Sequence, residues 1–172
     1  ELNAENNSAH HSVMMKDGEI LNRYCDEYDT ARPESYKEDI ELSHQSSQQP
    51  SALYKHLRAG AESGWDYSSR WFKDGKSFAT IHTADIVPVD LNCLLYHLEQ
   101  TIAEAYEING DTAKYQQYKL LAEKRKKAIQ KYCWNEDQGF YFDYDFVAQQ
   151  QTYCHSLAGV FPLFFKIAKG TV

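Results

Sequence analysis

The chain has 172 residues, of which 42% are hydrophobic and 14% are aromatic, and its formal net charge is −7. This is enough apolar chain for one domain with a sizeable core, and the composition excludes a disordered chain. The negative charge argues against nucleic acid or an anionic membrane as a partner. No apolar run approaches the length that a bilayer span requires.

Four cysteines lie at positions 25, 93, 133 and 154, with neither a C-x-x-C pair nor a zinc-finger spacing. A disulfide framework is not expected in a chain of this size with its own core. We therefore expect buried free thiols, which favours a cytoplasmic location, with the periplasm as the alternative. The adjacent His10 and His11 point in different directions in any regular structure, so no metal site is expected there.

The first third of the chain predicts two helices separated by polar loops. Residues 1–31 are polar, with a turn at Lys16–Glu19 between short extended pieces. Pro33 is suited to the first position of a helix, and that helix fades in the polar run 43–51. A second helix is expected over about Ser51 to Ala61, ending near Gly64. Its apolar residues recur on one face: Leu53, Leu57 and Ala61.

Residues 71–89 are rich in β-branched side chains and contain Pro88, so we expect an extended connection and not a long helix. His82 and Asp85 in this stretch resemble a catalytic pair. A structural histidine with satisfied hydrogen bonds is the preferred interpretation.

Two amphipathic helices follow. Asp90 is expected to cap the first, which Gly110 stops, and Asp111 caps the second, which reaches Tyr132. The basic cluster 124–127 fits a solvated helix face better than a nucleic-acid patch.

The last part predicts a small β-hairpin near 139–152 and an apolar helix from His155 to Ala168, kinked at Pro162. The side chains expected to point inward from that helix are Leu157, Phe161, Phe164 and Phe165.

The stretch Glu62–Trp71 is the main candidate site. Asp66 is a carboxylate set among aromatic side chains that could stack on sugar rings: Trp65, Tyr67 and Trp71. Partial desolvation by such rings would raise its pKa and suit it to act as a general acid. Gly64 leaves the approach to Asp66 open. The structural alternative makes Asp66 a helix cap that pairs with Arg70.

A second candidate is Arg32-Pro33-Glu34. Pro33 keeps Arg32 out of helical dihedrals, and Glu34 lies in the first helical turn, where the helix dipole favours a negative charge. The three residues form either a charged helix start or a loop-to-helix junction that presents an arginine and a glutamate to sugar hydroxyls.

Several blocks of the chain together resemble the trehalases, inverting glycosidases that split α,α-trehalose. The blocks are RPESYKED from Arg32, YKHLRAGA followed by ESGWDYSSRW, IVPVDLN, and WNEDQGFYFDYD. The resemblance covers the chain from Asn3 to about Ala168. It implies an all-α chain that forms part of an (α/α)6 toroid, with residues 1–172 as the central portion of a single catalytic domain that is incomplete at both ends.

The resemblance also implies roles for individual residues. Asp66 matches the general acid, and Arg32, Pro33, Glu34 and Gly64 match substrate-binding positions. No residue here matches the general base, so this chain alone is expected to be inactive. No cofactor or metal is expected, the partner is the disaccharide trehalose, and the full-length enzyme is expected to be a monomer.

Two alternatives remain open from the sequence. One is a non-catalytic helical-repeat binding module, because the helices between Asp90 and Tyr132 have the dimensions of one repeat; no second copy is visible. The other is a glucoamylase-like glycosidase on the same barrel.

Overall fold

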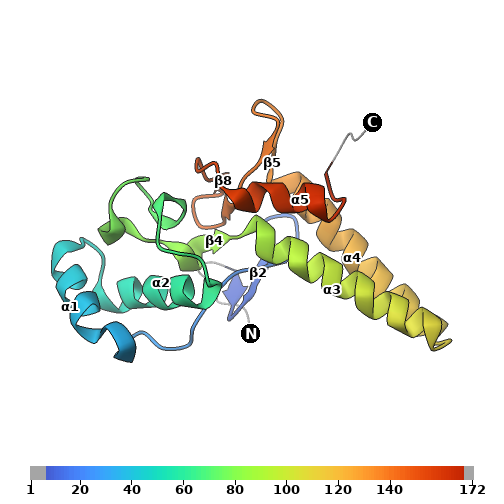
Figure 1. Cartoon of the computed structure of the whole chain (residues 1–172), viewed down its shortest axis with the longest axis horizontal. Helices are drawn as coiled ribbons and strands as arrows, with labels where there is room; N and C mark the ends of the chain where they lie inside the picture. The colour runs from blue at the N-terminus through green and yellow to red at the C-terminus, as the bar shows by residue number, and fades with distance from the viewer. Residues whose placement is uncertain (1–6, 169–172) are drawn as a thin grey trace.

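A computed structural model describes residues 7–168 and shows a mainly helical chain (Figure 1). The α-helices are α1 (Tyr36–Gln45), α2 (Pro50–Ser63), α3 (Val89–Ile108), α4 (Thr112–Tyr132) and α5 (Phe161–Phe164). Short 3-10 turns join them: η1 (Pro33–Ser35), η2 (Ser69–Trp71), η3 (Phe78–Thr80), η4 (Thr83–Asp85) and η5 (Leu157–Val160). The second helix and the extended 71–89 connection are where the sequence predicts them.

Three small antiparallel sheets complete the architecture of residues 7–168. The strands are β1 (Ser8–Ala9), β2 (Ser12–Met14), β3 (Ile20–Asn22), β4 (Ile86–Val87), β5 (Trp134–Asn135), β6 (Phe140–Tyr141), β7 (Tyr144–Asp145) and β8 (Gln150–Gln151). β1, β2 and β3 form one sheet, β4, β7 and β8 a second, and β5 with β6 a third. The hairpin predicted near 139–152 is confirmed as β7–β8, and β4 adds to it by pairing Ile86 with Asp145.

Helices α3 and α4 pack side by side as a hairpin, and this hairpin projects from the rest of the chain (Figure 1). Gly110 adopts a φ of 76° after the end of α3, and the Asp111 side chain accepts a hydrogen bond from the Lys114 amide at 3.1 Å. Both were predicted. Asp90, however, is not the cap of α3, because Pro88 occupies that position and Asp90 lies inside the first turn.

The predicted final helix is largely wrong. Only Phe161–Phe164 is α-helical, after the 3-10 turn η5, and Pro162 lies in the first turn, where its missing N–H costs nothing. There is therefore no kink. Leu157 and Phe164 are exposed in this chain, whereas Phe161 and Phe165 pack against the core as predicted.

The described core has two parts. The larger lies around α3, α4 and the small sheets, and the smaller lies between α2 and the 71–86 connection. Trp65 packs against both. The loop that follows α2 therefore lies where the two cores meet.

A buried ion network fixes that loop. Arg70 is only 3% exposed, and its guanidinium donates to Asp143 and Asp90 with shortest distances of 2.7 Å to each carboxylate. It also lies between two indoles, 4.7 Å from the Trp65 ring centroid and 4.3 Å from that of Trp71. Burial opposes the charge of Arg70, but the two carboxylates outweigh it and raise the guanidinium pKa. Asp90 therefore pairs with Arg70 instead of capping its helix.

His56 makes a second buried link, between α2 and η4. Its Nδ1 accepts a hydrogen bond from the Ala84 amide at 3.2 Å, and its Nε2 lies 3.9 Å from Asp85 Oδ2. Burial lowers the pKa of His56 to about 4. The imidazole is therefore held neutral between these two elements.

We predict that Arg70→Met destabilises the chain by about 3–5 kcal/mol, because it leaves two buried carboxylates without their cation. Urea unfolding followed by circular dichroism measures the change. Lys37→Met is the matched control, since Lys37 forms only an exposed pair with Glu41 at 3.8 Å. Equal stabilities for the two variants would contradict the role given to Arg70.

We predict that His56 makes folding sensitive to acid. Its pKa is about 4 in the folded chain and about 6.5 when unfolded, so the unfolded state binds the extra proton between these values. Its contribution to stability is intact above about pH 6.5 and falls by on the order of 2–3 kcal/mol as the pH drops to about 4. His56→Gln should flatten the pH dependence of the urea midpoint in this window. His44→Gln, on the exposed face of α1, should leave it unchanged.

Candidate functional site

Asp66 lies in the loop after α2. The helix ends at Ser63, and Gly64 closes it with a φ of 70°, in the left-handed region that favours glycine. The Asp66 side chain is exposed, and its carboxylate makes no hydrogen bond or ion pair with any residue of the described chain. It is therefore neither a helix cap nor the partner of Arg70, and the structural alternative is wrong. The expected desolvation of Asp66 by its neighbours is also absent from this chain.

The aromatic neighbours of Asp66 point inward. Trp71 is fully buried, and Trp65 covers the Arg70 guanidinium. Tyr67 lies against α2, with its ring beside Gly60. Trp65 and Tyr67 pack against the core, whereas Asp66 between them is exposed. The predicted stacking platform for a sugar is thus largely used as core.

Arg32 is buried and held by a single carboxylate. Its Nη2 and Nε donate to the two oxygens of Asp39 at 2.7 and 3.0 Å, and its Nη1 donates to the Tyr67 hydroxyl at 2.7 Å. The hydrogen bonds to Asp39 raise the pKa of Arg32, against the effect of its burial. Tyr67 in turn donates to the Leu57 carbonyl at 2.6 Å, and burial raises its pKa to about 12. The structure therefore joins Arg32 to the Asp66 loop through Tyr67.

Gly60 makes this connection possible, and sequence reasoning missed it. A Cβ on Gly60 would lie 2.4 Å from Cε1 of Tyr67, so any larger residue would displace the ring. The available signal was a glycine inside an otherwise regular helix, which usually marks a close approach.

The remaining predicted residues lie at the surface. Pro33 begins η1 as predicted, and Glu34 occupies its first turn with an exposed side chain. Gly64 has open space where a Cβ would project, so its backbone angle, and not crowding, requires glycine there.

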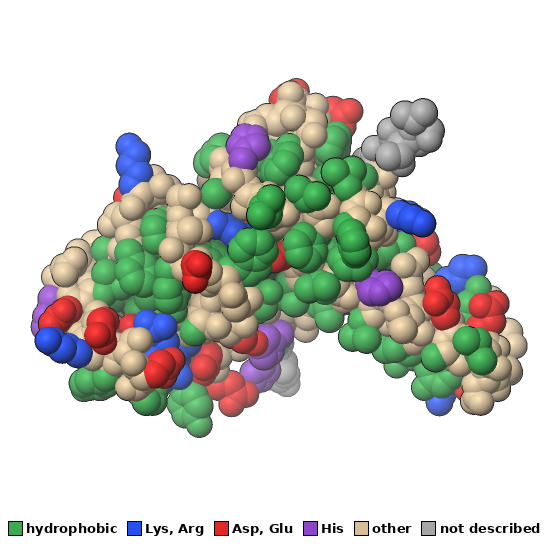
Figure 2. All heavy atoms as spheres, viewed as in Figure 1, with side chains coloured by type: hydrophobic (Ala, Val, Ile, Leu, Met, Phe, Trp, Pro, Cys, Tyr) green, Lys and Arg blue, Asp and Glu red, His purple; other side chains and the backbone are tan. Residues whose placement is uncertain are grey.

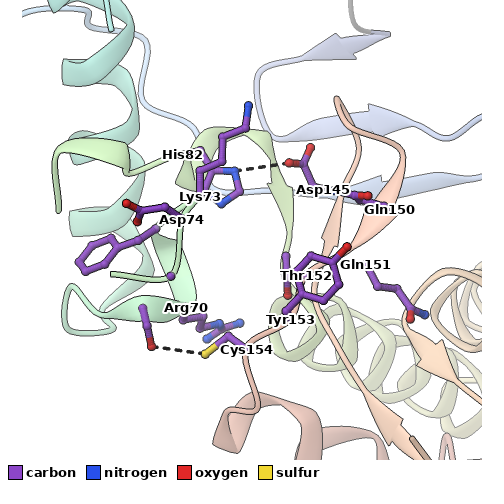
Figure 3. A pocket seen from close by; sticks show the side chains of 13 residues that line it. Arg70, Lys73, Asp74, His82, Asp145, Gln150, Gln151, Thr152, Tyr153 and Cys154 are labelled. Atoms are coloured by element: carbon purple, nitrogen blue, oxygen red, sulfur yellow. Dashed lines mark hydrogen bonds and ion pairs between the residues drawn. The ribbon is translucent and has the colours of Figure 1, made fainter. Parts of the chain in front are cut away.

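A pocket of about 430 Å³ lies between the 69–75 segment and β8 with the residues after it (Figure 3). Ser69 and Arg70 belong to its wall, whereas Asp66 does not. A second pocket, of about 540 Å³, lies between the N-terminal sheet and α2 and is lined in part by Arg23, Lys55 and Asp85.

His82 in the first pocket is paired with Asp145, not with the Asp85 that the sequence placed beside it. The distance from His82 Nδ1 to Asp145 Oδ2 is 3.4 Å. This buried nitrogen makes no hydrogen bond within residues 7–168, so the expected histidine with satisfied hydrogen bonds is not found. Burial raises the pKa of Asp145, but the neighbouring His82 and the hydrogen bonds from the amides of Val147 and Ala148 outweigh it, so the net shift is downward. The pairing depends on the β4–β7 register and is invisible in local sequence.

Other chemistry is limited within residues 7–168. No three histidine, cysteine, aspartate or glutamate side chains there are close enough to hold a metal ion. The four cysteines are free, and Cys93 and Cys133 are buried, which raises the pKa of both thiols. None of the described helices is long and apolar enough to cross a membrane.

Sequence comparison gives consistent matches. The family profile described as Trehalase matches residues 2–171. The periplasmic trehalase of Xanthomonas campestris pv. campestris (strain B100) is 48% identical over 162 residues, which are 94% of this chain and 28% of that protein. The periplasmic trehalase of Salmonella agona (strain SL483) is 46% identical over 157 residues, 91% of this chain and 28% of that protein. The chain thus spans less than a third of the length of these relatives.

The fold comparison agrees. A solved neutral trehalase from Saccharomyces cerevisiae superposes with a TM-score of 0.73 at 23% identity, covering 95% of this chain and 33% of the other. The prediction that the chain forms part of an (α/α)6 toroid is confirmed. With a family profile that matches almost every residue, the chain belongs to the trehalase family.

Proposed function

We propose that the protein carrying this chain hydrolyses α,α-trehalose to two glucose molecules with inversion, and that residues 1–172 are the central portion of its single catalytic domain. The family profile and the names of the relatives support trehalose as the substrate. The same matches weigh against the helical-repeat and glucoamylase-like alternatives. No cofactor or metal is required by this chemistry.

The surface of the chain supports its being part of a larger domain. Figure 2 shows hydrophobic side chains gathered over the centre of one face, around α5 and the adjoining part of α3. Exposed apolar residues on α3, η5 and α5 include Leu94, Leu98, Leu157, Leu163 and Phe164. A large exposed apolar patch usually marks an interaction surface. We assign this face to contacts with the remaining helices of the toroid.

The observation that carries the mechanism is the unpaired carboxylate of Asp66 on a loop whose neighbours are locked in place. Arg70 fixes the loop on one side and Tyr67 on the other. We assign Asp66 as the general acid that protonates the leaving glycosidic oxygen. Inversion then needs a second carboxylate, about 6.5–9.5 Å away, to activate water on the opposite face of the sugar. We assign that base to another part of the protein.

The substrate-binding roles follow from donors and acceptors that remain free. Three N–H groups of Arg32 are engaged by Asp39 and Tyr67, and a guanidinium has five, so two can reach a sugar hydroxyl. The exposed Glu34 carboxylate can accept hydroxyl hydrogens. In this proposal Pro33 sets the turn that presents both, and Gly64 keeps the approach to Asp66 open.

The same comparisons bear on location. The buried free thiols favour the cytoplasm, but the relatives are named periplasmic trehalases, so we propose the periplasm for this protein. We propose a monomeric enzyme.

We predict that the fresh product of trehalose cleavage by the full-length protein contains one β-glucose and one α-glucose per bond broken. Inversion changes the configuration of the glucose attacked by water, while the leaving glucose keeps its own. Proton NMR of the anomeric region within the first minutes measures the ratio. Initial product that is entirely α would contradict inversion, and absence of cleavage would contradict the substrate.

We predict that Asp66→Asn lowers trehalose turnover by about 10²–10⁴-fold, because the amide keeps the shape of the side chain but carries no acidic proton. An α-glucosyl fluoride needs less protonation of its leaving group, so its turnover should fall much less. Asp137→Asn, in the exposed β5–β6 turn, is the matched control and should leave both substrates unaffected.

An equal loss on both substrates, accompanied by a lower melting temperature, would instead make Asp66 a structural residue. The 172-residue chain tested alone should show no turnover even with Asp66 intact, because the base is supplied elsewhere.

A further inference from the structure

The pocket beside the Asp66 loop is not used by the proposed mechanism. Its volume of about 430 Å³ falls within the range of about 300–1,000 Å³ that is usual for small-molecule sites. Its walls come from the 69–75 segment, from His82 and Asp145, and from residues 150–154 (Figure 3).

His82 is a buried titratable residue in the wall of this pocket. Its residue is only 8% exposed, and its Nδ1 lies 3.4 Å from Asp145 Oδ2 without making a hydrogen bond within the described residues. Figure 3 shows the second ring nitrogen, Nε2, facing the open space between the walls. A carboxylate at Nδ1 favours the tautomer with the proton on that nitrogen. Nε2 therefore presents a lone pair to the pocket.

Asp145 is itself held rigidly. Its Oδ1 accepts the amides of Val147 at 3.0 Å and Ala148 at 2.8 Å, while β4–β7 pairing sets its backbone opposite Ile86. The carboxylate beside the His82 ring is thus fixed before any ligand enters, and a fixed wall lowers the entropic cost of binding.

The charges around the pocket nearly cancel. Arg70 makes four hydrogen bonds to its two buried carboxylates, which neutralise its charge. Lys73 and Asp74 are exposed residues of opposite charge at the rim. Among the described lining residues, this leaves Lys73 as the only cation without a buried counter-ion. A strongly anionic ligand would find little compensation here.

The uncharged lining offers hydroxyl partners and aromatic surface. Tyr153 is 80% exposed at the pocket wall, and Phe72 contributes a second ring. The Thr152 hydroxyl is buried without a hydrogen-bond partner in the described chain. Aromatic faces combined with hydrogen-bonding groups suit a ring that carries many hydroxyls.

We propose that this pocket binds one neutral sugar ring, with a hydroxyl of the sugar donating to His82 Nε2 and the Tyr153 ring covering one face. The site is independent of Asp66 and of the hydrolytic function proposed above. The ring is supplied either by a free monosaccharide or by one end of a disaccharide, and both have the same chemistry at this pocket.

The test is NMR on the 172-residue chain labelled with ¹³C in its histidines and ¹⁵N in its backbone. Glucose and trehalose are titrated separately to about 50 mM, well above a Kd in the millimolar range. Saturable shifts of the His82 ring and of the amides of residues 150–154 are expected, with the exposed His44 ring unmoved. A tighter Kd for glucose identifies the free monosaccharide, and a tighter Kd for trehalose identifies the disaccharide end.

Two variants make the assignment specific. His82→Gln should weaken sugar binding by roughly tenfold, the effect of losing one well-placed hydrogen bond. Tyr153→Ala removes an exposed side chain that the fold does not need, and it should weaken binding while leaving the backbone spectrum intact. His44→Gln, at an exposed residue outside this pocket, should bind sugar as the unmodified chain does.

Three results would overturn the proposal. One is the absence of any saturable shift at His82 with either sugar. Another is binding that persists unchanged in both His82→Gln and Tyr153→Ala. The third is preferential binding of inorganic phosphate at the same signals, which would make the pocket an anion site centred on Lys73.

Discussion

The structure depends on one buried guanidinium. Arg70 brings together Asp90 from the first turn of α3, Asp143 from the segment before β7, and the indoles of Trp65 and Trp71. These groups come from both parts of the core, so the network fixes how the two parts meet. A buried ion pair of this kind adds little net stability compared with apolar packing, but its directional bonds allow only one arrangement. The geometry of the Asp66 loop follows from that arrangement.

In the Asp66 loop, some residues hold the loop in place and a different residue, Asp66, is exposed. Its inward side chains hold the loop in place: Trp65 covers Arg70, and Tyr67 hydrogen-bonds both Arg32 and the Leu57 carbonyl of α2. The Tyr67 ring packs directly on the α2 backbone at Gly60, where a Cβ would collide with it. A reactive group must be held within about 0.5 Å of its working position by neighbours whose own conformations are locked. Asp66 has such neighbours on both sides and no partner of its own.

The sequence predicted those features that depend on interactions between residues close together in the chain. Periodicity located α2, α3 and α4, and the glycine and aspartate between the last two gave their turn, because caps and hydrophobic faces act over a few residues. The long-range pairs could not be found this way: Arg70 lies 73 residues from Asp143, and the partner of His82 is set by strand register. Asp90 was misassigned because an aspartate in a first turn suits both a cap and an ion pair. The aromatic residues around Asp66 resembled a binding platform but proved to be core, since composition does not tell which side of a loop a ring faces.

The exposure of Asp66 has a further consequence if it is the general acid. Such an acid must keep its proton near neutral pH, which usually requires a partly dehydrated environment. This chain fixes the loop that carries the Asp66 carboxylate but leaves the carboxylate in water. The apolar face that the chain presents on α3 and α5 is also uncovered. In the proposed mechanism, different parts of the molecule meet these two needs. The Arg70 and Tyr67 contacts place the Asp66 loop, and we propose that the helices that complete the toroid dehydrate the Asp66 carboxylate and supply the base.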